Sequence, residues 1–190
     1  MNSANLRNQI REELSSLSLR RVPTRYSREA AVLILIFEQD GEPCFLLTLR
    51  TDEVETHKGQ ISFPGGMRDG SEPLVATALR ETFEEVGIEE SRIEVLGQFH
   101  EYLSHTGYCV TPFVGFLSTP FTTVPQPREV AEVLHVTLRV FLDAGRLRVE
   151  RRLRMGKTME VYFYSYERHQ IWGLTAGMIK DFLEQVPLTF

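Results

Sequence analysis

The chain has 190 residues, of which 42% are hydrophobic, enough for one globular domain with a core but not for two separate cores. The formal net charge is −5, from 26 acidic and 21 basic residues, so binding mainly to nucleic-acid phosphates or anionic lipid is disfavoured. Apolar runs are too short to span a membrane, and the first residues lack the hydrophobic segment of a signal peptide. Cys44 and Cys109 lie in apolar runs, which predicts buried free thiols, a reducing compartment and a cytoplasmic protein.

The N-terminal segment has a helical pattern. Its apolar residues recur at helical spacing, as Leu6, Ile10, Leu14 and Leu17. This spacing predicts a short amphipathic helix, which Pro23 is expected to end. We therefore expect residues 1–26 to form a helical extension packed on a domain that spans residues 27–190. An exposed apolar face here would allow a homodimer, although covering the protein's own core is the commoner arrangement.

Two strands and a loop are predicted next. The apolar runs 30–37 and 44–50 flank the turn-forming residues 40–43, a pattern that is typical of a hairpin. The segment from 51 to 70 is rich in glycine and polar residues, which predicts a loop.

A helix is predicted from about Pro73 to Val86. Proline suits the first helical position, and Glu72 before it faces the positive end of the helix dipole. Gly87 suits the left-handed residue that ends a helix. The helix is expected to face the core with a stripe of residues at three- and four-residue spacing, namely Ala76, Leu79, Phe83 and Val86.

The remaining chain is predicted to add strands and a closing helix. The strands are expected over residues 93–103, 109–117, 130–140 and 159–166, and the helix over 174–186. A turn at 104–107 joins the first two strands. Strands interspersed with helices predict an α/β (α+β) fold, with a mixed β-sheet between helices in an α/β/α sandwich.

One stretch joins a glycine-rich loop to an acidic helix. Gly66 is followed after five residues by Glu72, and after seven more by the run from Arg80 to Ile88. This run contains three carboxylates, those of Glu81, Glu84 and Glu85. At about 100° per residue, the three share roughly a third of the helix circumference, where they would repel one another without a compensating charge.

This acidic face has the composition of a magnesium site. Magnesium takes oxygen ligands and binds through a few carboxylates plus substrate phosphates. We expect Glu81, Glu84 and Glu85 to bind Mg²⁺, with Mn²⁺ able to substitute. The carbonyl of Gly65 would complete the shell. Glu84 and Glu85 are also catalytic candidates, and Arg80 would orient a neighbouring glutamate. The alternative is a solvated helix face, which would normally mix both signs of charge; for the glycines the alternative is a plain tight turn.

The spacing from Gly66 to Ile88 resembles the Nudix box, which implies metal-dependent hydrolysis of a diphosphate linkage. The resemblance extends to those Nudix enzymes that cleave coenzyme A into 3',5'-ADP and 4'-phosphopantetheine. Their upstream block is matched by residues 46–50, by Gly59 and by residues 63–66. Further similarity lies at residues 106–112 and 171–176.

Two positions depart from the upstream block. Thr51 replaces a small serine or alanine, and Glu55 stands where the family has an arginine. Coenzyme A carries a ribose 3'-phosphate, so its pocket should supply an additional cation, for which Arg50, His57 and Lys58 are candidates. For each of these taken singly, an ordinary surface charge is an equal alternative.

The resemblance implies a set of substrate-binding residues, which are Arg50, His57, Lys58, Gly59, Gln60, Phe63, Gly66 and Tyr108. The base that activates water would be a box carboxylate or Glu129, which lies where the family has an acid before a strand. For Glu129 a solvent-facing loop carboxylate is an alternative, and His105 and Glu101 are weaker candidates.

Two rival functions remain open. A Nudix hydrolase of ADP-ribose, NADH, dinucleoside polyphosphates or a modified nucleotide would carry the same box. A nucleotide-binding regulator without catalysis would usually lose box carboxylates, which are all present here. An RNA-binding module is disfavoured by the acidic balance.

Overall fold

The computed structural model describes residues 3–23, 28–51, 59–154 and 156–188. In chain order its elements are α1 (Ser3–Ser16), β1 (Arg28–Gln39), β2 (Glu42–Arg50), β3 (Ile61–Ser62), β4 (Gly65–Met67), α2 (Leu74–Val86), β5 (Ile93–Gln98), β6 (Tyr102–Leu103), β7 (Tyr108–Leu117), β8 (Val130–Thr137), α3 (Arg139–Leu142), β9 (Leu147–Arg154), β10 (Lys157–Tyr166), β11 (His169–Trp172) and α4 (Leu174–Gln185). Short 3₁₀ turns, η1 (Glu90–Arg92) and η2 (Ala144–Arg146), precede β5 and β9.

The larger sheet is mixed, as predicted. Its strand order is β3-β2-β1-β7-β5, and β4, β6 and β8 pair with β1, β7 and β2. Among the described strands of this sheet only β1 and β7 run parallel, with Leu33 opposite Phe113. The predicted hairpin is confirmed as β1 and β2, and it turns on Asp40 and Gly41, both with positive φ.

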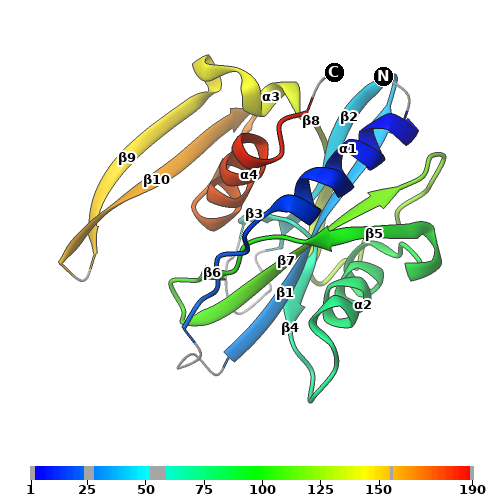
Figure 1. Cartoon of the computed structure of the whole chain (residues 1–190), viewed down its shortest axis with the longest axis horizontal. Helices are drawn as coiled ribbons and strands as arrows, with labels where there is room; N and C mark the ends of the chain where they lie inside the picture. The colour runs from blue at the N-terminus through cyan, green and yellow to red at the C-terminus, as the bar shows by residue number, and fades with distance from the viewer. Residues whose placement is uncertain (1–2, 24–27, 52–58, 155, 189–190) are drawn as a thin grey trace.

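Helices cover both faces of this sheet, which confirms the α/β/α sandwich (Figure 1). Successive β1 side chains alternate between the two faces. Leu33 and Leu35 pack with α2, whereas Ile34 and Ile36 pack in the cluster that contains residues of α1 and α4. Burial on both faces explains why β1 reads as one continuous apolar run.

The first helix ends earlier than predicted. Leu6, Ile10 and Leu14 are buried as expected, but α1 stops at Ser16 rather than near Pro23. Serine hydroxyls near the end hydrogen-bond helix carbonyls, as Ser16 Oγ does to Glu13 at 2.9 Å, an interaction that competes with further helix. The following residues instead contact the segment after β5. The Glu101 amide donates to the Arg20 carbonyl, the Arg20 amide donates to His100 Nδ1, and the Val22 amide donates to Glu101 Oε2.

The predicted helix over 73–86 is confirmed as α2, with Gly87 in the left-handed conformation at its end. The predicted core stripe was wrong at Phe83, which is 47% exposed, and Ala76 is only half-buried. Ala78 and Thr82 lie fully buried instead, and Leu79 is buried as predicted. The buried face is therefore rotated around the helix and includes part of the acidic side.

Several strand boundaries differ from the prediction. The loop over 51–70 contains β3 and β4, and the strand over 93–103 divides into β5 and β6. The run 130–140 ends as α3 rather than as a strand.

A second, three-stranded sheet of β11-β10-β9 was not predicted, beyond the strand at 159–166. In β9, arginines and a glutamate surround three apolar residues, so its pattern resembles a solvated segment.

Both cysteines are free, as predicted; Cys44 is buried and Cys109 half-buried. Burial raises the pKa of each thiol to about 11, so neither is a ready nucleophile at neutral pH.

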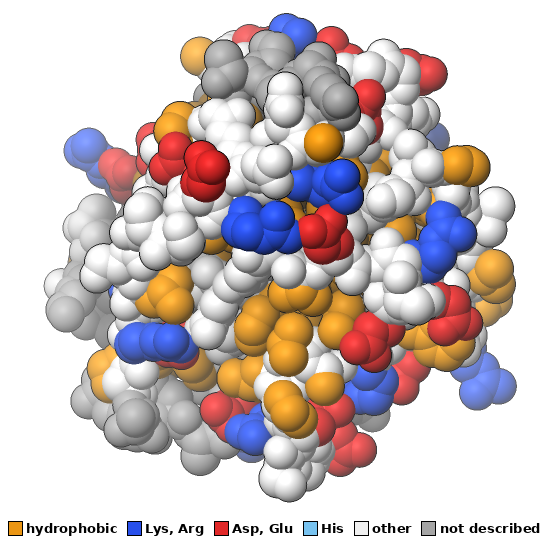
Figure 2. Space-filling view, turned by 45° about the vertical axis from the view of Figure 1, so that its right-hand side comes forward, with side chains coloured by type: hydrophobic (Ala, Val, Ile, Leu, Met, Phe, Trp, Pro, Cys, Tyr) orange, Lys and Arg blue, Asp and Glu red, His pale blue; other side chains and the backbone are white. Residues whose placement is uncertain are grey.

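Among the described residues, no helix has both the length and the apolar character needed to cross a membrane. Figure 2, with the α2 side brought forward, shows acidic, basic and hydrophobic side chains intermingled.

Candidate active site

Strand β4 lies against the acidic side of α2. A Cβ on Gly66 would stand 2.4 Å from the carboxylate carbon of Glu81, so only glycine leaves room for this carboxylate in its present position. Gly65 has φ +152°, and its Cβ would lie 2.3 Å from the carbonyl oxygen of Ala31 on β1. The two glycines thus permit β4 to pair with β1 and bring its backbone to the glutamate.

Arg80 organises the first part of the acidic face. Its guanidinium contacts Glu72 Oε1, Glu81 Oε1 and Glu84 Oε2, each at 2.9 Å. It also donates to the carbonyl of Met67 at 3.2 Å, which ties α2 to β4. These bonds raise the pKa of Arg80, with Glu72 as the largest cause. One arginine thus holds two of the three box carboxylates, and its orienting role stays a prediction.

Glu85 occupies a different environment from its neighbours. Its side chain is 2% exposed, against 16% for Glu81 and 53% for Glu84. Burial raises the pKa of Glu85 to about 8; the charge of Arg50 opposes this shift, and Glu81 and Glu129 reinforce it. Burial also raises the pKa of Glu81. These carboxylates are therefore held close together at a desolvation cost.

Arg50 is the cation that faces Glu85. Its Nη1 lies 3.2 Å from Glu85 Oε1, and its side chain is 21% exposed. Glu85 Oε2 and Arg50 Nε are buried and have no hydrogen-bond partner among the described residues. Arg50 was predicted to bind substrate. The structure places it in contact with Glu85, one of the three carboxylates (Glu81, Glu84 and Glu85) that form the acidic cluster of α2.

The segment before β8 brings a fourth carboxylate to the cluster. Glu129 is half-buried, and its charge raises the pKa of both Glu81 and Glu85. Its carbonyl accepts from the amide of Thr51, and the amide of Gln126 donates to the carbonyl of Glu85, both at 2.9 Å. Glu129, a candidate from the resemblance, therefore lies beside the box carboxylates.

The cluster fits a hard divalent cation in its donor chemistry. Its ligand atoms are carboxylate oxygens, and the buried, unpartnered Glu85 Oε2 is an acceptor that a cation would satisfy. With Arg50 and Arg80 paired as they are, no three acidic, histidine or cysteine side chains of the described ranges converge as a metal shell. A cation would therefore compete with these guanidinium groups for the same oxygens.

The predicted substrate residues lie in different places. Phe63 is 2% exposed and packs edge-on against Phe45, with ring centroids 5.4 Å apart, so its side chain supports the loop from within the core. Gly59 has φ +64°, and the carbonyl of Gln60 accepts from the amide of Arg50. His57 and Lys58 lie outside the described residues. Tyr108 begins β7 and lies half-buried beside Met67.

Sequence reasoning missed the pairing of Arg50 with Glu85. These residues are 35 positions apart and come from β2 and α2. No spacing rule links a strand end to a helix face at that separation. The only available signal was the position of Arg50 in the upstream block.

Comparisons with known proteins agree on one family. The model of the NUDIX domain matches residues 27–162. A Photorhabdus laumondii protein named "Uncharacterized Nudix hydrolase NudL" is 41% identical over 161 residues, covering 84% of this chain and 86% of that protein. A Yersinia pestis (strain Pestoides F) protein of the same name is 40% identical over 163 residues, with 85% and 81% covered.

Solved structures agree with the fold. The Nudix hydrolase RenU from M. smegmatis superposes with a TM-score of 0.52 at 27% identity, covering 60% of this chain and 73% of that chain. The C. elegans Ap4A hydrolase binary complex gives a TM-score of 0.50 at 20% identity, covering 59% and 81%. At that identity the second likeness concerns the fold alone.

Proposed function

The chain belongs to the Nudix hydrolase family, and from that premise we propose that it hydrolyses the diphosphate linkage of coenzyme A in a Mg²⁺-dependent reaction. The products are 3',5'-ADP and 4'-phosphopantetheine. Acyl or oxidised forms of coenzyme A share the same linkage and belong to the same substrate class.

One observation carries the choice of substrate. The first part of the upstream block that resembles coenzyme A hydrolases, residues 46–50, ends at Arg50, and Arg50 lies 3.2 Å from Glu85 of the acidic cluster. The amide of the next residue, Thr51, is bonded to the carbonyl of Glu129. The block therefore borders the place where a diphosphate would be hydrolysed, where its residues can contact the rest of the substrate.

The cluster supplies the groups that the reaction requires. Glu81, Glu84 and Glu85 would hold Mg²⁺, or Mn²⁺ in its place. The bound cation supplies neutralisation of the diphosphate charge and makes a nearby water more acidic. Arg80 keeps Glu81 and Glu84 oriented through its two 2.9 Å contacts.

A general base must accept the proton of the attacking water. Glu129 suits this role, because it comes from a separate segment beside the cluster and forms no ion pair within the described part of the chain. Water adds to one phosphorus, the bridging P–O bond breaks, and the other phosphate leaves with the bond's electron pair. Glu129 takes the water proton.

A panel assay tests the substrate. The purified full-length chain is incubated with Mg²⁺ and coenzyme A, ADP-ribose, NADH or a dinucleoside polyphosphate, and the products are separated and identified by mass. We expect the highest kcat/KM for coenzyme A, by at least about tenfold, which corresponds to about 1.4 kcal/mol of transition-state preference. A matched reaction with a metal chelator should be inactive. Equal or faster turnover of another diphosphate would refute coenzyme A as the preferred substrate.

A further inference from the structure

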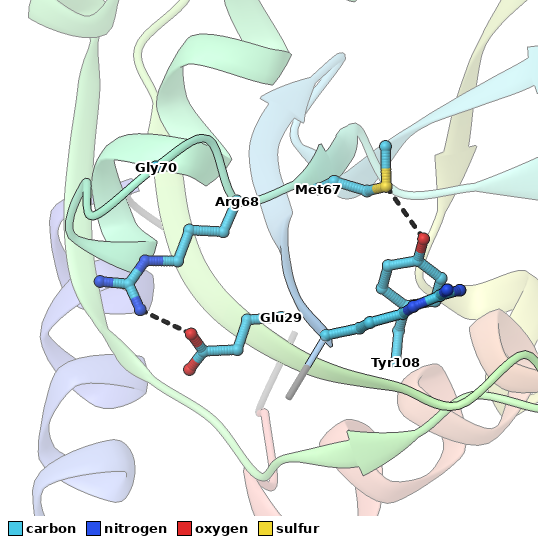
Figure 3. Close-up of a pocket in the computed structure, with 6 residues that line it drawn as sticks. Glu29, Met67, Arg68, Gly70 and Tyr108 are labelled. Carbon is cyan, nitrogen blue, oxygen red and sulfur yellow. Dashed lines mark hydrogen bonds and ion pairs between the residues drawn. The ribbon is translucent and has the colours of Figure 1, made fainter. Parts of the chain in front are cut away.

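A pocket of about 430 Å³ lies where β1 and β7 begin and β4 ends (Figure 3). It is lined by Arg28, Glu29, Met67, Arg68, Gly70 and Tyr108. Two arginines and one glutamate leave one positive charge in excess. Except for Tyr108, none of these residues was assigned a role from the sequence.

One of the two arginines is bound within the protein through each of its three nitrogens. Arg68 Nη1 contacts Glu29 at 2.6 Å, as Figure 3 shows, and neutralises that carboxylate. Its Nε donates to the carbonyl of Glu72 at 2.7 Å, and Nη2 donates to that of Ser71 at 3.2 Å. All three Arg68 nitrogens thus already donate within the protein, and Arg68 stabilises the loop before α2.

The other arginine keeps its donors available. The Arg28 guanidinium carbon lies 5.6 Å from the ring centroid of Tyr108, its partner in the parallel β1–β7 pairing. Within the described ranges Arg28 forms no hydrogen bond or ion pair through its side chain. Stacking restricts the guanidinium without using its N–H groups, which suits it to bind a phosphate through two parallel hydrogen bonds.

The pocket adjoins the acidic cluster through Met67. The carbonyl of Met67 accepts a hydrogen bond from Arg80, the residue that also holds Glu81 and Glu84. On the pocket side, the Met67 sulfur accepts from the Tyr108 hydroxyl at 3.0 Å (Figure 3). One residue thus separates the proposed diphosphate site from this pocket, so a substrate held at the first can reach the second.

We propose that this pocket binds an anionic group on the nucleoside end of the substrate, with Arg28 as its cation. In coenzyme A this group is the ribose 3'-phosphate, a dianionic monoester close to the diphosphate. The inference rests on the proposed function and makes Arg28 a specificity-determining residue. Arg50 is less suited to the role, because its guanidinium already pairs with Glu85.

Selectivity for the 3'-phosphate tests the inference. We compare kcat/KM for coenzyme A and for 3'-dephospho-coenzyme A in the parent chain and in Arg28→Ala. Losing a charge-assisted phosphate contact should lower the ratio of the two values by at least about tenfold, mainly through KM for coenzyme A. Arg28→Lys keeps the charge without the planar fork and should give an intermediate ratio.

Arg151→Ala is the matched control, since Arg151 is 78% exposed on β9 of the other sheet. It should leave the ratio unchanged. If the parent hydrolyses coenzyme A and Arg28→Ala keeps the parental ratio, the pocket inference is wrong while the proposed function stands.

If the parent fails to hydrolyse coenzyme A, a binding measurement tests the pocket inference separately from the proposed function. Calorimetry then compares adenosine 3',5'-bisphosphate with AMP on the parent chain and on Arg28→Ala. The pocket inference predicts a loss of about tenfold or more in bisphosphate affinity relative to AMP. Equal losses for both nucleotides would overturn it independently of catalysis.

Discussion

A substitution at Gly66 should disturb the geometry of the site with little effect on the stability of the fold. In Gly66→Ala the added Cβ would lie 2.4 Å from the Glu81 carboxylate, so this carboxylate must move. It can move because it is the far end of a flexible side chain. We expect Mg²⁺-dependent turnover to fall by roughly 10–100-fold, the usual effect of losing a residue that positions a metal ligand. The free energy of unfolding, measured in urea, should change by less than about 1 kcal/mol.

Gly177→Ala on α4 is the control for this prediction. Apart from its chain neighbours and the backbone of its own helix, no atom lies within 4 Å of the Cβ it would add. Alanine also favours helix over glycine, so stability should rise by about 0.5–1 kcal/mol with unchanged turnover. Full activity in Gly66→Ala would show that the position of Glu81 is irrelevant to the reaction.

The buried carboxylate of Glu85 should make the metal-free protein sensitive to alkaline pH. Its folded pKa of about 8 exceeds the unfolded value near 4.3, so the folded state binds the proton more tightly. Stability is therefore fully present below about pH 4.3 and is lost as the pH rises through 8, by up to about 1.4 kcal/mol per pH unit. Urea unfolding between pH 5 and 9 measures this slope in the presence of a chelator.

Glu85→Gln removes the titrating group and should flatten the slope. The slopes, rather than the absolute stabilities, are compared, because the variant also removes the charge partner of Arg50. Identical slopes in the two proteins would mean that Glu85 is ionised in the folded state throughout this range.

At the scale of elements, α1 should contribute to the stability of the whole protein. Ile10 is fully buried in the cluster that also contains residues of α4 and the sheet. Ile10→Ala removes buried methyl groups and leaves a cavity, so the free energy of unfolding should fall by about 2–5 kcal/mol. Denaturant unfolding followed by circular dichroism measures the change.

Glu12→Ala replaces an exposed residue on the same helix and should change stability by no more than about 0.5 kcal/mol. A similarly small effect of Ile10→Ala would show that α1 adds little to the folded core.

Elements with strong local signals could be predicted from the sequence. The hairpin of β1 and β2 has an Asp-Gly turn between apolar runs, and α2 ends at a left-handed glycine. Strand β9 could not be found in this way, because its arginines hide the two-residue alternation. The exposure of Phe83 could not be anticipated either. The spacing of apolar residues along a helix does not specify which side of the helix packs against the sheet.

The candidate site was predictable to the extent that it is local. Glu81, Glu84 and Glu85 lie within one helix, so their proximity follows from helix geometry. Their different burial does not, because it depends on β4 and on the segment around Glu129. The pairing of Arg50 with Glu85 is likewise a tertiary contact with no local signature.

For the molecule as a whole, the layered fold explains how the carboxylates tolerate one another. The site draws on β2, β4, α2 and the segment before β8, which the mixed sheet and its helix hold together. Packing against β1 keeps α2 from turning its acidic side into solvent. The fold thus holds mutually repelling carboxylates close together. A bound cation would relieve this repulsion and stabilise the folded protein relative to its metal-free form.

The most direct test of this account is the Mg²⁺-dependent turnover of coenzyme A by Glu85→Gln beside the parent chain. Replacing a ligand should cost at least about 100-fold in kcat/KM, more than the loss of a residue that only supports one. The same loss is expected for any other diphosphate that the parent accepts. Parental rates in Glu85→Gln would contradict the claim that the buried acidic cluster holds the metal that drives hydrolysis.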